Sequence, residues 1–366
     1  MPGIEAYVRS MPKIDPYVHL EGTVRPATLL RLADRHGVTL PAENEASLAR
    51  WLRYRSYTQF LEVVMTVRSC IRRASDLEEV TRDFLTAAWE DGVVYSEAVI
   101  APKALGSSGD REFHARVDAI NHARSWAARE LGVGMSIVVD LPRTARIDDA
   151  VHATRRAAER RGEGVVAVGV NGPDEGKPIG EFAPVFAAAG DRGLRTVVHA
   201  GETGGPEAIW NALEVGPPSR IVHGLTAAGD DRLVAELAAE GPMLAMCPSG
   251  HVLTQSVGSL SEHPMPLLVQ AGVPVGLCTD WQWVFGTNLS AEYLAVFRAC
   301  EQAHGWDRRN LEQLVLQGVE QTFLSDHDRS ELRRRFHAKF RELSGRRRPI
   351  EPRPRLEQGR MSPRRS

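Results

Sequence analysis

The 366-residue chain has few cysteines, no long apolar run and little net charge, and each absence excludes a class of protein. The four cysteines include no closely spaced pair, so neither a disulfide framework nor a zinc knuckle is indicated. No stretch approaches the roughly eighteen uninterrupted apolar residues of a membrane helix, and the start of the chain has no basic segment followed by an apolar one. We therefore expect a reduced, cytoplasmic protein that is neither secreted nor inserted in a membrane.

Charge is distributed unevenly along the chain. The formal net charge is −2, but residues 345–366 carry eight arginines against two glutamates, so the rest of the chain carries −8. An acidic body argues against a nucleic-acid-binding surface. Residues 1–344 are expected to form a single catalytic domain, which is the default for a chain of this length. The basic, Pro/Arg-rich residues 345–366 have little to bury and are expected to be disordered, with contact to RNA or an acidic partner as the alternative.

Apolar runs of strand length alternate with stretches of helical periodicity. This alternation predicts an α/β protein with a parallel sheet, and eight strands is the number at which such a sheet closes into a (β/α)8 TIM-type barrel. Additional helices are expected after the first strand, as an inserted lid at residues 27–36, 45–54 and 58–72, and at the C-terminus, at residues 290–303, 308–317 and 328–343. The predicted strands are residues 13–19, 93–100, 133–141, 164–170, 194–199, 220–222, 242–246 and 273–278.

Four short strings each place a metal-capable or proton-handling side chain directly after a predicted strand. They are Tyr17-Val18-His19-Leu20-Glu21-Gly22, His199-Ala200-Gly201-Glu202, Val222-His223-Gly224 and Cys278-Thr279-Asp280. The carboxyl ends of barrel strands meet on one face, so we expect these side chains to lie together. Neutral imidazoles with a carboxylate suit a hydrolytic zinc site, and a nearby carboxyl group can carry protons. Taken singly, each string also fits a turn with a structural polar group.

As an ordered set, these motifs resemble the adenosine deaminase family of the amidohydrolase superfamily, from about Pro12 to Phe323. The resemblance implies an eight-stranded barrel carrying one zinc ion, which activates water for attack at C6 of an aminopurine nucleoside with release of ammonia. It is carried by Pro12-Lys13, His19-Leu20-Glu21-Gly22, His199-Ala200-Gly201-Glu202, Arg220-Ile221-Val222-His223-Gly224, Cys247-Pro248, Thr279-Asp280 and Asn288-Leu289-Ser290-Ala291-Glu292-Tyr293.

The resemblance also implies roles for individual residues. His19, His199 and Asp280 would be the zinc ligands, and Asp280 would thereby also belong to the catalytic set. Glu202 would protonate the purine ring at N1, and His223 would handle the proton of the attacking water. A small-molecule nucleoside is therefore the expected partner.

The substrate-binding positions are partly altered. Glu21 matches the acidic position that contacts the ribose, and Gly172 matches a backbone contact to the base. Tyr17 replaces the first histidine of a two-histidine motif, so metal affinity should fall. Its phenol either binds the metal, hydrogen-bonds nearby or only packs. Trp281 replaces an aspartate implied to hydrogen-bond N7, which puts adenosine itself in doubt, and Trp281 either stacks on a ring or occludes the purine pocket.

A third departure follows the seventh predicted strand. The family has a serine and an asparagine where this chain has Gly250 and His251. His251 either supplies a substitute ligand or substrate contact, or is an exposed loop histidine, which is the simpler interpretation.

Three hypotheses follow for the function. The first is metal-dependent deamination of an adenosine-like purine nucleoside. The second is a repurposed family member that acts on a modified nucleoside in specialised biosynthesis, with weak metal binding or none. The third is a non-catalytic nucleoside-binding protein in which Trp281 stacks on the base. Another zinc deaminase class, and phosphate-binding glycine loops, are excluded because their signatures are absent.

Overall fold

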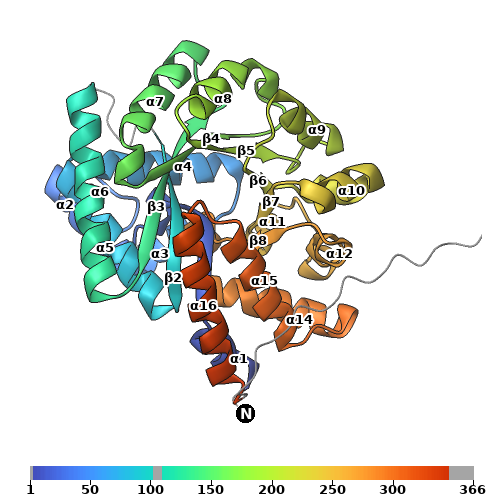
Figure 1. The fold of residues 1–366 in the computed structure, drawn as a ribbon. Helices are drawn as coiled ribbons and strands as arrows, with labels where there is room; N and C mark the ends of the chain where they lie inside the picture. The colour runs from blue at the N-terminus through green and yellow to red at the C-terminus, as the bar shows by residue number, and fades with distance from the viewer. Residues whose placement is uncertain (1–2, 102–108, 346–366) are drawn as a thin grey trace, which may run out of the picture.

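The computed structural model describes residues 3–101 and 109–345. Eight parallel strands are hydrogen-bonded in chain order and form a barrel surrounded by helices (Figure 1). All eight predicted strands are confirmed, with ends that shift by at most two residues. The strands are β1 (Lys13–His19), β2 (Val93–Ile100), β3 (Gly134–Pro142), β4 (Val165–Asn171), β5 (Arg195–Ala200), β6 (Arg220–His223), β7 (Met243–Met246) and β8 (Val275–Leu277).

The barrel closes where β1 meets the residues that follow β8. Val18 and Asp280 form a parallel bridge. The amide of His19 donates to the carbonyl of Asp280 at 2.8 Å, and the amide of Asp280 donates to the carbonyl of Tyr17 at 3.1 Å. Because a closed barrel has no free edge, these two bonds complete the sheet and place the first and last strand ends side by side.

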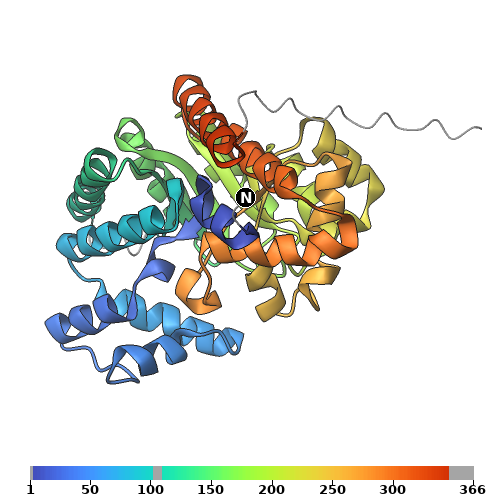
Figure 2. The same ribbon diagram turned by 90° about the horizontal axis from the view of Figure 1, so that it is seen from below.

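Three helices between β1 and β2 confirm the helical insertion expected from the sequence. They are α2 (Pro26–His36), α3 (Glu45–Leu52) and α4 (Tyr57–Cys70), and in Figure 2 they lie together, in blue, on one side of the barrel. Helix α3 ends two residues earlier than predicted, because the amide of Tyr54 bonds to the carbonyl of Val284 at 2.8 Å instead of continuing the helix.

The remaining helices cover the outside of the barrel and its two ends. Many begin at a side chain that accepts a backbone N–H of the first turn, as Asn288 does from Ala291 and Ser325 from Asp328. They are α1 (Ile4–Ser10), α5 (Ala74–Glu90), α6 (Asp110–Glu130), α7 (Ile147–Glu159), α8 (Ala183–Gly190), α9 (Pro206–Val215), α10 (Asp231–Glu240), α11 (Pro248–Leu253), α12 (Met265–Ala271), α13 (Gln282–Phe285), α14 (Leu289–His304), α15 (Arg308–Glu320) and α16 (Asp326–Leu343).

Two further predictions concern the basic C-terminal tail and the absence of membrane-spanning helices. The basic tail lies outside the described residues from residue 346 onward, so its predicted disorder stays a prediction. Within residues 3–101 and 109–345, no helix is both long and apolar enough to cross a membrane.

A buried ion pair spans the interior of the barrel. Arg220 begins β6, Glu97 lies on β2, and these strands face each other across the eight-stranded ring. The Arg220 Nη1 atom lies 2.5 Å from Glu97 Oε2, and both side chains are fully buried. Arg220 also donates to the carbonyl of Gln321 at 3.0 Å, and its guanidinium packs over the ring of Phe323 at 4.1 Å.

Removing one charge of this pair should destabilise the barrel strongly, because the remaining charge stays buried without compensation. We expect Glu97→Gln to lower the free energy of unfolding by about 3 kcal/mol. Urea denaturation measures the change. Glu320→Gln is the matched control, since its pair with Arg333 lies at the surface with side chains 44% and 54% exposed. A surface pair of this kind contributes under about 1 kcal/mol. Equal effects of the two changes would contradict the argument.

Candidate active site

The predicted site residues lie together at the carboxyl ends of the strands. His19 ends β1, His199 lies near the end of β5, His223 ends β6, and Asp280 follows β8. His19 Nε2 lies 3.5 Å from Asp280 Oδ1, and His223 Nε2 lies 3.2 Å from His199 Nδ1. Four side chains separated by up to about 260 residues therefore form one cluster, as the barrel topology requires.

Tyr17 places its hydroxyl group in the middle of this cluster. The hydroxyl oxygen lies 2.6 Å from His199 Nε2, 3.3 Å from His19 Nε2 and 3.4 Å from Asp140 Oδ2. The side chain is fully buried, and burial beside Asp140 and Asp280 raises the pKa of the phenol well above its ordinary value. Of the alternatives left open by the sequence, the structure shows a neutral phenol hydrogen-bonded to the two histidines.

Two of these residues have backbone conformations that side chains other than glycine rarely adopt. His223 has a φ of 71° and Asp280 a φ of 53°. Such conformations cost about 1–3 kcal/mol and persist only where surrounding contacts impose them. The amide of Gly224, bonded to the carbonyl of Ala200 at 3.0 Å, supports His223, and the barrel-closing bonds support Asp280. The strain is therefore concentrated at the side chains that meet in the cluster.

Glu202 and His223 form a possible acid–base pair at the edge of the cluster. Glu202 Oε2 lies 3.4 Å from His223 Nε2, and its side chain is 25% exposed whereas that of His223 is 4% exposed. Asp174 holds the turn that carries Glu202, since its carboxylate accepts the backbone amides of Glu202 and Gly204 at 3.1 and 3.0 Å. Glu202 therefore has a fixed backbone, a solvent-accessible carboxylate and a histidine within reach.

Burial sets the protonation states of the cluster. Desolvation lowers the pKa of His19 to about 3 and that of His199 well below its ordinary value, so both imidazoles are neutral near neutral pH. Desolvation likewise raises the pKa of Asp140 to about 7 and that of Asp280 well above the usual range. A cationic partner at this position would stabilise both carboxylates in their charged form.

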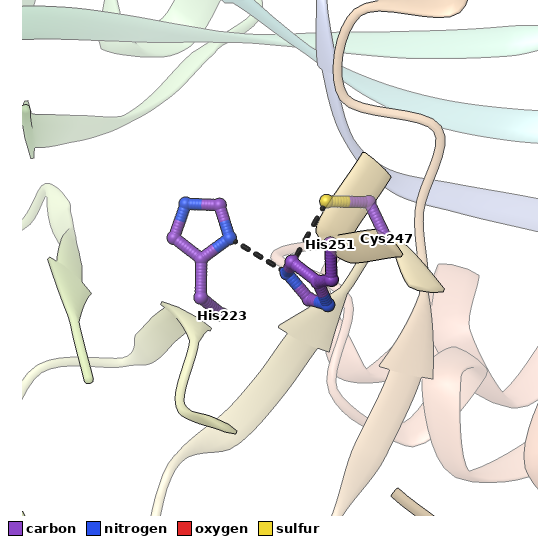
Figure 3. A group of neighbouring side chains, drawn as sticks. All are labelled: His223, Cys247 and His251. Carbon is purple, nitrogen blue, oxygen red and sulfur yellow. Dashed lines mark hydrogen bonds between the residues drawn. The ribbon is translucent and has the colours of Figure 1, made fainter. Parts of the chain in front are cut away.

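Two neighbouring sets of metal-capable side chains are present among the described residues. One set is His19, Asp140 and His199, whose ligand atoms all lie within 4.8 Å of one another. Asp280 adjoins it, and its buried Oδ1 atom has no hydrogen-bond partner. The other set is His223, Cys247 and His251 (Figure 3).

The interpretation of His251 as an exposed loop histidine is wrong. His251 belongs to helix α11, whose N-terminal end follows β7 directly, and it is only 1% exposed. Its Nε2 atom lies 2.9 Å from His223 Nδ1 and 3.4 Å from Cys247 Sγ (Figure 3). The short helix turns the imidazole inward against the site, whereas the prediction placed His251 on an exposed loop.

Trp281 forms a wall of the site behind His19. Its ring stacks on the His19 imidazole with centroids 4.6 Å apart and planes 23° apart, and Phe60 of α4 packs edge-on at 5.1 Å. The indole also lies so close to Gly22 that a Cβ atom there would be 2.8 Å from Trp281 Cε3. His19 covers one face of the indole. Because Trp281 is only 6% exposed, neighbouring groups hold its side chain on several sides.

Glu21 and Gly172 lie near the mouth of the barrel. Glu21 Oε1 pairs with Arg68 Nε of α4 at 3.4 Å, while its buried Oε2 atom has no hydrogen-bond partner. Gly172 follows β4 and has a φ of 118°, which a glycine adopts without strain, and its Cα faces the Arg143 side chain. A Cβ atom at this position would lie 3.6 Å from Arg143 Cβ, so the Arg143 side chain covers that face of the backbone.

Two side chains of the site were missed from the sequence. Asp140, at the end of β3, contacts Tyr17 and accepts a hydrogen bond from Asn171 of β4. It follows the apolar run that ends in Val139, so the signal that identified Asp280 applies to it as well. His263 lies between β7 and β8 with its Nε2 atom 2.9 Å from His251 Nδ1, and no local pattern marked it.

Comparison with known proteins identifies the relatives of the chain. The sequence model of the family described as "Adenosine deaminase" matches residues 12–339. The chain is 34% identical over 323 residues to an aminodeoxyfutalosine deaminase of Streptomyces coelicolor, covering 88% of this chain and 82% of the relative. It is 30% identical over 336 residues to an adenine deaminase of Rhodopseudomonas palustris, covering 92% and 96%.

A solved structure supports the same fold. An amidohydrolase from Burkholderia ambifaria, solved with bound Zn, superposes with a TM-score of 0.79 at 23% identity, covering 93% of each chain. The family match spans nearly all of the described residues. The chain therefore belongs to the adenosine deaminase family and is an adenosine-deaminase-like hydrolase.

Proposed function

We propose that the protein deaminates a 6-aminopurine nucleoside by hydrolysis, with the residues of the cluster as its active site. The observation that carries the proposal is the meeting of His19, His199 and Asp280 with the Glu202–His223 pair, whose atoms lie 3.4 Å apart, at the carboxyl ends of the barrel strands. The reaction replaces the C6 amino group of the purine with oxygen from water and releases ammonia.

The residues present fit a divalent metal ion. His19 and His199 are neutral and need lose no proton to act as ligands, and Asp280 keeps a buried carboxylate oxygen without a hydrogen-bond partner. The family relative from Burkholderia ambifaria is described with bound Zn. Tyr17 competes with a metal for His199 Nε2, so we expect weaker binding than with a histidine at this position. When bound, the metal would lower the pKa of water and stabilise developing negative charge.

The side chains of the protein account for the proton transfers. Glu202 would carry the first proton of the attacking water, and His223 would contact the oxygen of that water. As the bond between the water oxygen and C6 forms, Glu202 would deliver a proton to N1 of the purine ring. The C6–N bond then breaks, and the amino group leaves as ammonia with the second proton of the water. Placement of such a pair contributes about 10²–10⁴ to the rate.

One observation favours a nucleoside over free adenine as the substrate. Glu21 Oε2 is buried without a hydrogen-bond partner, although Oε1 of the same carboxylate pairs with Arg68. A buried acceptor without a partner costs about 1–3 kcal/mol, which a sugar hydroxyl would recover and a free base would not. Glu21 and, from the family resemblance, the backbone at Gly172 are therefore proposed as substrate contacts.

A substrate other than adenosine is favoured by the changed positions. Trp281 replaces the aspartate implied to contact N7 of a purine and stacks on His19 instead, and Tyr17 weakens the metal site. A relative at 34% identity is named an aminodeoxyfutalosine deaminase, so its named substrate differs from adenosine. The second candidate function is accordingly deamination of a modified nucleoside. Turnover of 5′-substituted or N6-substituted adenosines without turnover of adenosine would select it.

Loss of the Glu202 carboxyl should abolish most of the deamination. We expect Glu202→Gln to lower kcat at least about 100-fold with little change in KM, because the amide cannot transfer the proton to N1. Ammonia release from a panel of aminopurine nucleosides measures the rate, before and after treatment with a metal chelator. Glu207→Gln, an exposed glutamate five residues on, is the control. Tight nucleoside binding by the wild-type protein without any ammonia release would instead support a binding protein.

Restoring a histidine at position 17 should strengthen metal binding. We expect Tyr17→His to raise zinc affinity at least about tenfold, because it adds an imidazole donor and removes the hydroxyl that occupies His199 Nε2. Metal content after dialysis against chelators of graded strength measures the effect. Tyr17→Phe, which removes the hydroxyl and adds no donor, separates the two causes. An unchanged affinity in Tyr17→His would show that the cluster does not hold the metal.

Glu21 should distinguish a nucleoside from a free base. We expect Glu21→Gln to raise KM about tenfold for the nucleoside and to leave turnover of adenine unchanged, since only the sugar would contact the carboxylate. Steady-state kinetics on both compounds provide the comparison, with the exposed Glu62→Gln on α4 as the control. The same rise in KM for both compounds would mean that Glu21 contacts the base, or that it only supports helix α4 through Arg68.

A further inference from the structure

Four histidines form a continuous row that leads away from the cluster. His199 Nδ1 lies 3.2 Å from His223 Nε2, and His223 Nδ1 lies 2.9 Å from His251 Nε2. The row continues from His251 Nδ1 to His263 Nε2 at 2.9 Å. At every step, the Nδ1 atom of one ring faces the Nε2 atom of the next, so each ring is bonded through both nitrogens.

A backbone amide fixes the direction of this row at its outer end. The N–H of Met265 donates to His263 Nδ1 at 3.1 Å. Met265 is the first residue of α12, and a first-turn amide has no carbonyl partner within its own helix. Because a backbone amide can only donate, His263 Nδ1 must be an acceptor. A neutral His263 then carries its proton on Nε2 and donates to His251 Nδ1.

The same reasoning passes from ring to ring. His251 accepts at Nδ1, so its own proton is on Nε2 and points toward His223 Nδ1. His223 in turn accepts at Nδ1 and carries its proton on Nε2. That proton has two acceptors within reach, His199 Nδ1 at 3.2 Å and Glu202 Oε2 at 3.4 Å. If a metal binds His199 Nε2, the proton of His199 lies on Nδ1, and the Glu202 carboxylate remains as the acceptor of the His223 proton.

Burial supports the neutral form on which this reasoning depends. His251 and His263 are 1% and 5% exposed. Desolvation lowers the pKa of His263 to about 4 and that of His251 well below its ordinary value. Neither ring therefore carries a second proton near neutral pH.

Cys247 is compatible with the same arrangement. Its sulfur lies 3.4 Å from His251 Nε2 (Figure 3) and can share that N–H as a weak acceptor. The S–H of Cys247 donates to Asp280 Oδ2 at 3.6 Å. No donor other than His251 contacts His223 Nδ1 among the described residues. The row is thus fully paired without a metal ion at His223, Cys247 and His251.

We propose that His251 and His263 are positioning residues that hold His223 in the tautomer with its proton on Nε2, facing the reaction site. The catalytic consequence rests on the proposed deaminase function. A neutral His223 of this tautomer cannot accept a proton at Nε2, and it instead donates a hydrogen bond to the oxygen of the attacking water. Glu202 then takes the proton of the water as the O–C6 bond forms, and passes that proton to N1.

The tautomer can be measured without any assay of activity. In protein labelled with ¹⁵N-histidine, correlations between ring nitrogens and carbon-bound ring protons distinguish a protonated from an unprotonated nitrogen. We expect His223, His251 and His263 to carry the proton on Nε2 near neutral pH. Single histidine variants assign the signals, with the exposed His122→Leu as a control whose side chain is 74% exposed. A proton on His223 Nδ1 would overturn the proposal.

Substitution of His263 tests the link to the reaction. We expect His263→Leu to turn the His223 signals into those of a tautomer mixture and to lower kcat about tenfold, with KM changed by less than about twofold. His263→Gln, whose amide can accept from Met265 and donate to His251, should restore the single tautomer and most of the rate. A single Nε2–H tautomer of His223 that persists in His263→Leu would show that the row does not set it.

The two proposals fail in different ways. Absence of ammonia release from the wild-type protein would refute the deaminase function. The ¹⁵N-histidine signals would still show which nitrogen of His223 carries the proton. Titration with Co²⁺ provides a further test. A sulfur-to-cobalt charge-transfer band that is lost in Cys247→Ser would mean that His223, Cys247 and His251 bind metal, and it would overturn the row as a hydrogen-bonded device. We expect no such band.

Discussion

Closure of the barrel between β1 and the segment after β8 is the constraint on which the site depends. Two backbone hydrogen bonds, of 2.8 and 3.1 Å, hold Asp280 against Tyr17 and His19. These bonds impose the left-handed backbone of Asp280 and bring its carboxylate within 3.5 Å of the His19 ring. Without these bonds, the first and last strands would form free edges, and Asp280 would separate from Tyr17 and His19. The stability of the sheet and the geometry of the site therefore have a common origin.

The altered positions of this family member act as a connected set. Tyr17 places a hydroxyl between His19 and His199, and Trp281 stacks on the opposite side of His19. Beyond His223, the inward-facing His251 continues the hydrogen bonds of the site to the N-terminal end of α12. Glu202 and Asp280 are unchanged from the pattern of the family. The substitutions thus lie together at the positions to which we have assigned metal affinity, base recognition and the tautomer of His223.

Much of the fold and part of the site could be predicted from the sequence. The eight strands were found because parallel strands are buried on both faces and therefore form apolar runs, as residues 93–100 do. Polar residues at strand ends, such as His223, could be identified because they directly follow such apolar runs. Asp140 follows one as well. His263 gave none, because its role arises from a loop that folds against α11. The burial of His251 was predicted wrongly because a short helix after Cys247 could not be recognised from the sequence.

The contact between Gly22 and Trp281 has a consequence for how this chain can vary. A Cβ atom at position 22 would lie 2.8 Å from the indole, so even an alanine there must displace the ring from His19. The tolerance of position 22 thus depends on which residue stands 259 positions later in the chain. The two sites are epistatic. A mutational path that exchanges the indole for a small side chain must take that step before position 22 can enlarge. The reverse order passes through a protein in which the packing of Trp281 beside His19 is disturbed.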